Sequence, residues 1–267
     1  MGIARSDFAH AVNPSGRNAH PTTAMTTRER ADRLLVARGL FESRARAQAA
    51  IAAGRVTADG VLVRKASDEI SPAAAIAAQP EHPFVSRGGV KLAAALDRLA
   101  LDVEDRVCLD VGASTGGFTE VLLQRGAGRV YAVDVGSHQL HPRLRGRDDV
   151  VSLEQTDIRK LDPSQLPQQP DFAAVDVSFI SLKLVLPAVG RLLGSRATIL
   201  ALIKPQFEAG RREARKGIVR DEAVHAAVCA DITAFLAALG WRVGRALPSA
   251  IRGGDGNQEF FIEAERG

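Results

Sequence analysis

Apolar and polar residues follow a regular alternation of elements over the second half of the chain. Apolar runs of five to eight residues recur at 106–111, 129–135, 149–153, 171–177 and 197–204. Between most of them the apolar residues have helical spacing, notably over 116–125 and 181–193. Short apolar runs are typical of buried strands, and strands that alternate with helices favour a parallel sheet. The pattern therefore predicts an α/β fold with a mostly parallel, doubly wound sheet.

Further elements flank this repeat on both sides. VKLAAALDRLA at 90–100 has helical spacing and precedes the first run. A long helix is expected over 221–239, followed by strands near 241–246 and 258–264. The expected order therefore closes with a long helix and a final pair of strands.

The N-terminal part has a different and shorter pattern. One helix is expected around Leu34–Val36, ending at Gly39, and a second runs from an N-cap at Ser43 to Ala53. Short strands are expected around the turn at Asp59–Gly60. We therefore expect a flexible tail at 1–25, a small α+β domain at 26–80, a linker at 81–87 and the α/β domain at 88–267.

Composition excludes several classes of protein. No apolar run reaches the roughly 18 residues of a membrane span, and residues 1–20 have no apolar core of a secretory signal. The two cysteines, Cys108 and Cys229, are too few for a disulfide framework and favour buried thiols in a cytoplasmic protein. The net charge of +4 with a pI near 9.4 hints only weakly at a polyanionic partner.

The glycine-rich stretch VCLDVGASTGGFTEVLLQRG at 107–126 carries the first chemical signal. It is no triphosphate loop, because Gly117 is followed by Phe118 where such a loop needs lysine. Gly112 and the pair Gly116–Gly117 also have the wrong spacing for a dinucleotide fingerprint. A strand, a carboxylate and glycines without a cation suit a ligand that has no phosphate, and S-adenosylmethionine is such a ligand.

Carboxylates at successive strand ends support this interpretation. Asp110 and the loop amides are expected at the amino-acid end of the ligand, Asp134 at the ribose hydroxyls and Asp157 at the adenine edge. The loop and these residues together predict a Rossmann-like class I methyltransferase sheet behind the small N-terminal domain. The expected cofactor-binding residues are Asp110, Gly112, Ala113, Ser114, Gly116, Gly117, Phe118, Asp134, Val135 and Asp157.

Lysines at strand ends indicate the reaction. Only six of the 35 basic residues are lysines, and Lys204 lies at the C-terminal end of a strand candidate, as Asp176 does. Lysine can accept a proton once its pKa falls, which arginine cannot do. Together with Lys91 and Glu259, these residues form a candidate site for methylating a hydroxyl group. Each of them taken singly is better explained as a structural ion pair.

The small domain resembles the RNA-binding domain named after ribosomal small-subunit protein four. The resemblance rests on GL-x-x-SR-x-x-A-x-x-x-I-x-x-G-x-V-x-x-x-G, which begins at Gly39 and ends at Gly60. It implies that the arginine-bearing second helix contacts RNA, although a solvated basic helix is the alternative. The expected RNA-binding residues are Arg38, Ser43, Arg44, Arg46, Arg55, Arg64, Lys65 and Arg87.

The whole chain from 28 to 264 resembles the TlyA family of rRNA 2′-O-methyltransferases, which share the catalytic arrangement of FtsJ-like methyltransferases. VSRGGVKL, DVSFISL, LIKPQFE and GNQEFF carry the resemblance beside the glycine loop. It implies methylation of a cytidine ribose in ribosomal RNA, with catalysis by Lys91, Asp176, Lys204 and Glu259. Lys204 would act as the base or steer the 2′-oxygen, Lys91 and Glu259 would position the ribose, and Asp176 would lie between the lysines and the cofactor.

Two departures from the family affect the expectations. His82–Val85 stands where the family has an Arg-x-Trp-Val linker tied to interdomain coupling. The chain also ends soon after the last strand, whereas family members that act on both subunits have longer C-terminal ends. The resemblance therefore implies large-subunit RNA as substrate, with small-subunit RNA as the alternative. The expected partners are ribosomal RNA and ribosomal subunits, with no membrane and no metal.

Two other functions remain as alternatives. A membrane-lytic hemolysin would need a lytic amphipathic helix, but the apolar face of 221–239 is better explained by packing on the sheet. A non-catalytic RNA-binding ribosome-assembly factor would not need the lysines and carboxylates at 91, 176, 204 and 259. His138 and His141 have no ligand partners at metal-binding spacing.

Overall fold

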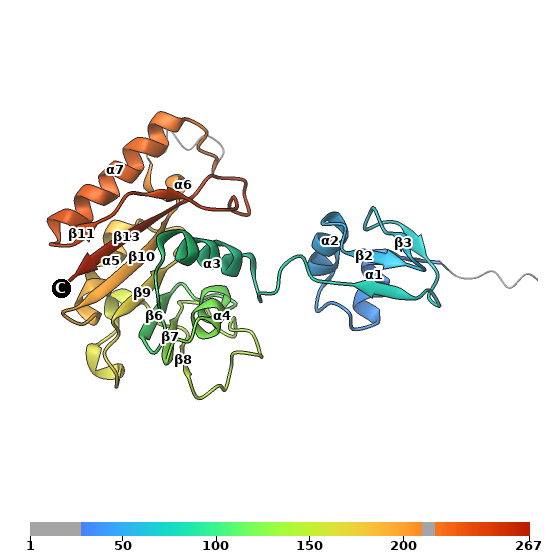
Figure 1. The fold of residues 1–267 in the computed structure, drawn as a ribbon, viewed down its shortest axis with the longest axis horizontal. Coiled ribbons are helices and arrows are strands. Elements are labelled where there is room, and N and C mark those ends of the chain that lie inside the picture. Colours follow the sequence, from blue (N-terminus) through green and yellow to red (C-terminus); the bar gives the residue numbers. More distant parts are fainter. Residues whose placement is uncertain (1–27, 210–216) are drawn as a thin grey trace, which may run out of the picture. The chain divides into compact units, whose positions relative to one another are not determined.

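The computed structural model describes residues 28–209 and 217–267 (Figure 1). The expected tail at 1–25 lies outside the described residues. The chain divides into two compact units, Met1–Glu81 and His82–Gly267. Each unit has its own buried apolar cluster, as expected of a unit that folds around its own core.

The first unit is a small α+β fold. Its helices are α1 (Ala31–Ala37) and α2 (Arg44–Ala52), and its strands are β1 (Glu29–Arg30), β2 (Val56–Ala58), β3 (Val61–Leu62), β4 (Glu69–Ile70) and β5 (Ile76–Ala78). β1 pairs with β4, and β2 lies between β3 and β5, all antiparallel. The Ser43 hydroxyl accepts a hydrogen bond from the amide of Arg46, which confirms the predicted N-cap of α2.

A buried carboxylate joins the two helices of this unit. Asp32 on α1 has no exposed surface and accepts hydrogen bonds from Arg30, Arg44 and Gln48. The hydrogen bond from Arg30, with those from Arg44 and Gln48, holds the pKa of Asp32 well below its usual range against the opposing effect of burial. Arg44 at the start of α2 is therefore partly occupied in holding α2 to α1.

The second unit contains the predicted doubly wound sheet. Its strand order is β11-β13-β10-β9-β6-β7-β8, and β12 pairs with β13. The strands are β6 (Val107–Val111), β7 (Arg129–Val133), β8 (Val150–Leu153), β9 (Phe172–Val175), β10 (Ala197–Ile203), β11 (Arg242–Val243), β12 (Leu247–Pro248) and β13 (Phe260–Arg266). β8, β7, β6, β9 and β10 run parallel, while β13 is antiparallel to β10. The α/β fold class is thereby confirmed.

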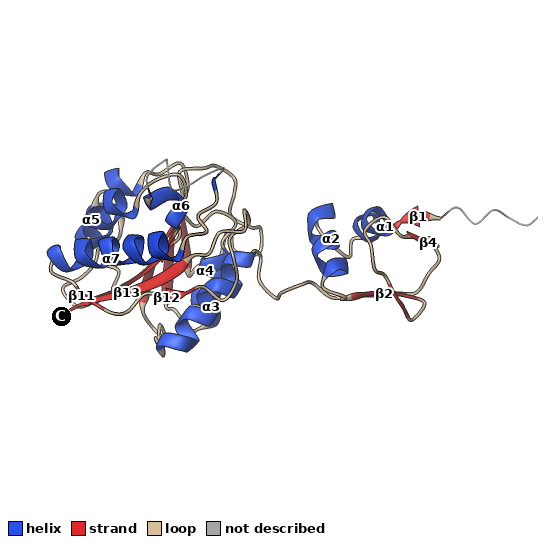
Figure 2. Cartoon of the chain, turned by 90° about the horizontal axis from the view of Figure 1, so that it is seen from above, coloured by secondary structure: helices blue, strands red, loops and turns tan. Residues whose placement is uncertain are grey.

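Helices cover both faces of this sheet (Figure 2). The helices are α3 (Arg87–Leu99), α4 (Gly117–Gln124), α5 (Leu182–Leu192), α6 (Pro205–Glu208) and α7 (Glu222–Ala238), with 3-10 turns at Ile158–Lys160 and Pro163–Gln165. α3 and α4 pack on one face around Phe118 and Phe172, and α5 and α7 pack on the other around Val185 and Ile232. The apolar face of α7 thus packs on the sheet.

The sequence pattern did not predict the shortest helices and strands of the structure. β1, β4, β5, β12 and α6 span two to four residues each. Such segments carry too few residues for a periodic pattern, and their pairing depends on partners far along the chain. The strand expected near 241–246 is reduced to Arg242–Val243, with Trp241 buried just before it.

Candidate functional site

The chain reverses its direction of winding between β6 and β9. From β6 it proceeds outward to β7 and β8, then returns to place β9 on the other side of β6. Ligands in open α/β sheets bind outside the carboxyl ends of the strands at such a switch point. Asp110 lies near the end of β6, and Asp176 directly follows β9. The sequence-predicted residues therefore converge on the edge where a ligand is expected.

The loop after β6 is shaped by close backbone contacts. Gly112 has φ of +85°, and a Cβ there would lie 2.4 Å from the carbonyl oxygen of Asp176. A Cβ on Gly117 would lie 2.1 Å from the Ser86 hydroxyl. Glycine is required at both positions because no side chain fits, and the loop is therefore held tightly between β9 and the start of α3.

Asp110 lies beneath this loop with no exposed surface. Its Oδ2 accepts a hydrogen bond of 2.6 Å from the Thr119 hydroxyl, while Oδ1 has no partner among the described residues. Burial, with the nearby charges of Asp176 and Asp134, raises the pKa of Asp110 to about 7. A buried carboxylate oxygen without a partner is the kind of atom that a bound amino group would satisfy.

A cavity of about 490 Å³ opens beside the loop, within the range of small-molecule sites. Of the expected cofactor-binding residues, it is lined by Gly112, Ser114, Asp134, Val135 and Asp157. We call it the donor cavity. Asp110, Ala113, Phe118, Gly116 and Gly117 do not line it. The Phe118 ring is buried against Phe261, with ring centroids 6.2 Å apart.

Two carboxylates at the donor cavity differ in their partners. Asp134 accepts the amides of Ser114 at 2.8 Å and of Gly136 at 2.7 Å, so it fixes the turn between β7 and the glycine loop. Asp157 is paired with Arg159, whose guanidinium lies 2.7 Å from Oδ2. The hydrogen bond from Arg159 lowers the pKa of Asp157 to about 2. Asp157 therefore presents a paired carboxylate, and Asp134 keeps lone pairs that can accept hydroxyl groups.

A second cavity of about 230 Å³ adjoins the first. The two share Gly112, Ser114, Asp176 and Ser178 in their linings. Lys91 and Lys204 line only the second, which we call the acceptor cavity. Its lining also includes Ala113, Gly117 and Phe118. A reacting group in one cavity can therefore meet a group in the other across the residues they share.

Lys91 and Glu259 form a buried ion pair at the acceptor cavity. Lys91 Nζ lies 2.6 Å from Glu259 Oε2, and the two residues are 8% and 2% exposed. Burial raises the pKa of Glu259, although the charge of Lys91 opposes the shift. The pair joins α3 to the segment before β13, which are 168 positions apart in the chain.

Lys204 and Asp176 form a second ion pair. Lys204 Nζ lies 2.6 Å from Asp176 Oδ1 and donates a hydrogen bond of 2.7 Å to the Ser178 hydroxyl. Asp176 Oδ1 has no directed hydrogen bond, so the contact is ionic. The structure thus brings Lys91, Asp176, Lys204 and Glu259 to one end of the sheet as two lysine–carboxylate pairs.

Several side chains at the site were not predicted from the sequence. Phe179 is 90% exposed, lines the donor cavity and stands 5.0 Å from the Phe207 ring between centroids. Ser178 holds Lys204, and Gln139 and Thr156 also line the donor cavity. Ser178 and Phe179 lie within DVSFISL, directly after Asp176. Phe179, an aromatic residue close to the strand-end carboxylate Asp176, is the sequence signal that could have identified this part of the site.

The expected RNA-binding residues fall into two groups. Arg55, Arg64 and Lys65 have exposed side chains near the hairpin of β2 and β3. Arg38 donates hydrogen bonds to the carbonyls of Ala74 and Pro72, so its guanidinium is held within the unit. Arg46 lies 3.9 Å from Glu42, and Arg87 of the second unit donates to the carbonyl of Arg252 at 2.8 Å.

Two negative observations concern the described residues. Over 28–209 and 217–267, no group of three or more His, Cys, Asp or Glu side chains could hold a metal ion. No helix of the same ranges is long and apolar enough to cross a bilayer.

Comparisons with known proteins match both units. Residues 84–266 match the FtsJ-like methyltransferase family, and residues 29–76 match the S4 domain. The rRNA methyltransferase candidate YqxC of Bacillus subtilis is 44% identical over 88% of this chain and 85% of its own length. The 16S/23S rRNA (cytidine-2′-O)-methyltransferase TlyA of Mycobacterium tuberculosis is 42% identical over 89% of this chain and 90% of its own length.

A solved structure gives the same relationship. The protein from Streptococcus thermophilus, described as a candidate hemolysin, is 44% identical and has a TM-score of 0.71 over 90% of this chain and 89% of its own. The family match covers more than half of the chain, and the relatives are similar along nearly all of it. The chain therefore belongs to the TlyA group of FtsJ-like methyltransferases, enzymes that use S-adenosylmethionine as methyl donor.

Proposed function

We propose that the protein transfers a methyl group from S-adenosylmethionine to the 2′-hydroxyl of a cytidine in ribosomal RNA. The observation that carries this proposal is the pair of lysine–carboxylate contacts at the acceptor cavity, next to the donor cavity. A ribose hydroxyl is a weak acid, so its methylation needs cations that stabilise the oxygen as its proton leaves. Lys91 and Lys204 supply such cations.

Apart from Arg159, which is paired with Asp157, the donor cavity is lined by uncharged and acidic groups that suit the methyl donor. Asp134 would accept the ribose hydroxyls, and the exposed Val135 would contact the adenine. The free Oδ1 of Asp110 would accept the amino group of the methionine part. When bound there, S-adenosylmethionine supplies an electrophilic methyl group. The remaining steps belong to the side chains of the acceptor cavity.

Lys204 would steer the 2′-oxygen. Asp176 and Ser178 hold its Nζ at the acceptor cavity, where it is placed to donate a hydrogen bond. Of the two roles expected from the sequence, this placement supports steering. Lys204 would donate a hydrogen bond to the 2′-oxygen while the hydroxyl proton leaves to water. Asp176 and Ser178 would hold the ammonium in place.

Lys91 and Glu259 would position the ribose. Burial of the pair fixes both side chains, and Lys91, which lines the acceptor cavity, would offer its remaining hydrogen-bond donors there. A preorganised pair loses little entropy when substrate binds. Lys91 would contact the ribose directly, because it lines the cavity, whereas Glu259 would hold Lys91.

Phe179 would support the base of the target nucleotide. A ring that is 90% exposed beside the cavities offers a stacking surface for an unstacked base. A Phe179→Ala variant is expected to raise KM for RNA without changing the melting temperature. An unchanged KM would argue against this contact.

The first unit would dock the enzyme on ribosomal RNA. Arg55, Arg64 and Lys65 are exposed and suit phosphate contacts, which position a protein without reading sequence. We propose that the protein acts in the cytoplasm, where this partner is found. We favour large-subunit RNA as substrate.

The test uses the two ribosomal subunits separately. Purified protein is incubated with tritiated S-adenosylmethionine and each subunit from a strain that lacks the gene, and label in RNA is counted. We expect label in large-subunit RNA. Label in small-subunit RNA alone would correct the subunit, and absence of label from both would contradict the proposal.

A further inference from the structure

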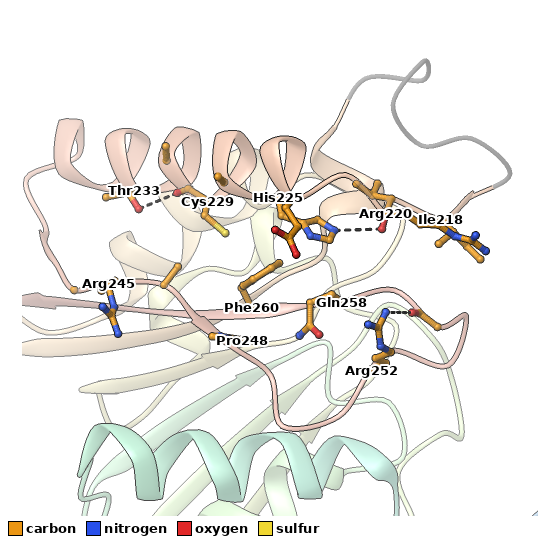
Figure 3. Close-up of a pocket in the computed structure, with 17 residues that line it drawn as sticks. Ile218, Arg220, His225, Cys229, Thr233, Arg245, Pro248, Arg252, Gln258 and Phe260 are labelled. Atoms are coloured by element: carbon orange, nitrogen blue, oxygen red, sulfur yellow. Dashed lines mark hydrogen bonds between the residues drawn. The ribbon is translucent and has the colours of Figure 1, made fainter.

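A pocket outside the donor and acceptor cavities lies between α7 and the segment that contains β12 and the start of β13 (Figure 3). Its volume is about 1120 Å³, above the roughly 1,000 Å³ that bounds most small-molecule sites. The donor cavity, at about 490 Å³, is less than half as large. The size of this pocket, which we call the α7 groove, suits an extended ligand better than a small molecule.

The α7 groove is rimmed by arginines. Arg220 and Arg252 lie toward one end, and Arg245 lies toward the other (Figure 3). All three are exposed, and within 28–209 and 217–267 none of their guanidinium groups forms an ion pair. Glu222 is the one carboxylate among the described lining residues. The groove therefore presents net positive charge that the described part of the chain does not neutralise.

The floor of the groove is aromatic and polar. Phe260 and His225 meet edge to face, with ring centroids 5.3 Å apart and an interplanar angle of 60°. Gln258 and Pro248 line the same surface (Figure 3). Cations at the ends of a groove and aromatic faces between them are the two features by which proteins hold single-stranded nucleic acid.

The chain around Glu259 and Phe260 separates the groove from the Lys91–Glu259 pair, which lie on opposite faces of the sheet. Phe260 pairs with Ile203 in the sheet. Glu259 directly precedes Phe260 in the chain, and Lys204 directly follows Ile203. Successive residues of an extended chain point to opposite faces, so Glu259 reaches Lys91 while Phe260 faces α7. Asn257 is fully buried and binds the Val219 amide at 2.9 Å and the Gly217 carbonyl at 2.8 Å. Asn257 thereby fixes the Arg220 end of the groove relative to Glu259.

We propose that the α7 groove binds the RNA strand that flanks the target nucleotide. Phosphates would lie against Arg220, Arg252 and Arg245, with a base against Phe260 and His225. This inference rests on the proposed function for the identity of the RNA, and it adds a substrate-binding surface on the methyltransferase unit itself. Charge complementarity selects RNA over an apolar ligand, and Phe260 in the groove directly follows Glu259 in the chain.

The test measures how RNA binding depends on salt. Full-length protein is titrated with a fluorescein-labelled oligocytidylate of about 16 nucleotides. One variant carries Arg220→Gln, Arg245→Gln and Arg252→Gln. A charge-matched control carries Arg125→Gln, Arg147→Gln and Arg196→Gln, which lie outside the groove. Loss of three phosphate contacts should reduce the slope of log K against log salt by about 2, with no comparable change in the control.

Three further measurements make the outcome decisive. Affinity for S-adenosylmethionine, measured by calorimetry, should match wild type in both variants and shows that they fold. The single variants Arg220→Gln and Arg245→Gln should each reduce the slope by about 0.7. A triple Arg→Lys variant should bind RNA nearly as tightly as wild type. Equal salt slopes in the groove and control variants, or slopes unchanged from wild type, would overturn the proposal.

The readout separates this inference from the proposed function. RNA binding is measured without methyl transfer, so a groove effect in a protein that labels no ribosomal RNA would leave the groove standing and remove the proposed function. Labelled ribosomal RNA without an effect of the groove substitutions on RNA binding would support the proposed function and contradict the groove proposal. If the groove variant binds the oligonucleotide normally but loses activity on whole subunits, the groove faces another component of the ribosome and the proposal fails.

Discussion

Lys91 Nζ and Glu259 Oε2 lie 2.6 Å apart in a site where both residues are buried. Removal of one member of a buried pair leaves an uncompensated charge and costs about 3–5 kcal/mol. We therefore expect Glu259→Gln to lower the free energy of unfolding by about 3 kcal/mol. Urea denaturation measures this value. The exposed pair of Arg125 and Asp97 is the matched control, and Asp97→Asn should cost about 1 kcal/mol or less.

The same pair separates stability from catalysis. A Lys91→Met, Glu259→Leu double variant replaces the ion pair by apolar side chains of similar size, which should recover most of the lost stability. The double variant should not transfer methyl groups, because the ribose would lose the Lys91 cation. A double variant that regains both stability and activity would show that the pair is structural only.

Lys204 is expected to act as a cation. Lys204→Ala should lower kcat by about 10²–10³, the usual cost of removing one stabilising donor, with unchanged affinity for the methyl donor. Lys204→Arg keeps the charge and should lie between alanine and wild type. Single-turnover methylation with tritiated donor distinguishes them. An arginine variant as inactive as alanine would instead support a proton acceptor at this position.

Asp110 makes stability depend on pH. Its pKa in the folded protein is about 7, above the 3.8 of an ordinary aspartate, so between these values the folded state binds more protons than the unfolded state. The contribution of Asp110 to stability therefore falls as pH rises from about 4 to 7 and is constant above that. Asp110→Asn removes the titration, so its melting temperature relative to wild type should rise by several degrees from pH 5 to pH 8.

The same substitution should weaken the methyl donor. Asparagine offers no negative charge to an amino group, so calorimetry should show a higher Kd. The exposed Asp97→Asn serves as control in both measurements. A difference in melting temperature that does not change with pH would contradict the buried, proton-binding state of Asp110.

Gly112 tests the close approach of the loop to β9. Gly112→Ala would place Cβ 2.4 Å from a backbone oxygen, at a positive φ that alanine adopts only with strain. Gly146 has a similar φ of +81° but open space around it, so Gly146→Ala carries the backbone strain alone. We expect Gly146→Ala to cost about 1–2 kcal/mol and Gly112→Ala clearly more, with loss of donor binding. Equal costs would mean that the loop yields easily.

Sequence pattern was sufficient for the sheet and insufficient for the details of the site. The strands β6, β7, β9 and β10 are largely apolar and largely buried, as burial on both faces of a parallel sheet requires, so their positions could be predicted. That Lys91 would meet Glu259 depends on the packing of α3 against the end of β13, which no local pattern contains. The catalytic roles assigned to these residues stay predictions.

Burial and exposure of side chains account for the other differences between the predicted and the observed site. Asp110 and Phe118 are predicted to bind the ligand, and the structure buries Asp110 beneath the loop and Phe118 against Phe261, which the sequence pattern does not indicate. The sequence did not single out Ser178 and Phe179 within the DVSFISL motif, because the exposure of a side chain at a strand end depends on the neighbouring loops. The α7 groove joins residues from 218 to 260 whose polar character in sequence resembles any solvated surface.

The central claim is methyl transfer to a cytidine 2′-oxygen through Lys204. The most direct measurement incubates ribosomal subunits with labelled S-adenosylmethionine and either wild type or Lys204→Ala, then digests the RNA to nucleosides and identifies the labelled one by mass spectrometry. We expect label in 2′-O-methylcytidine with wild type and almost none with the variant. Label on a base, label on another nucleoside, or full activity of Lys204→Ala would contradict it.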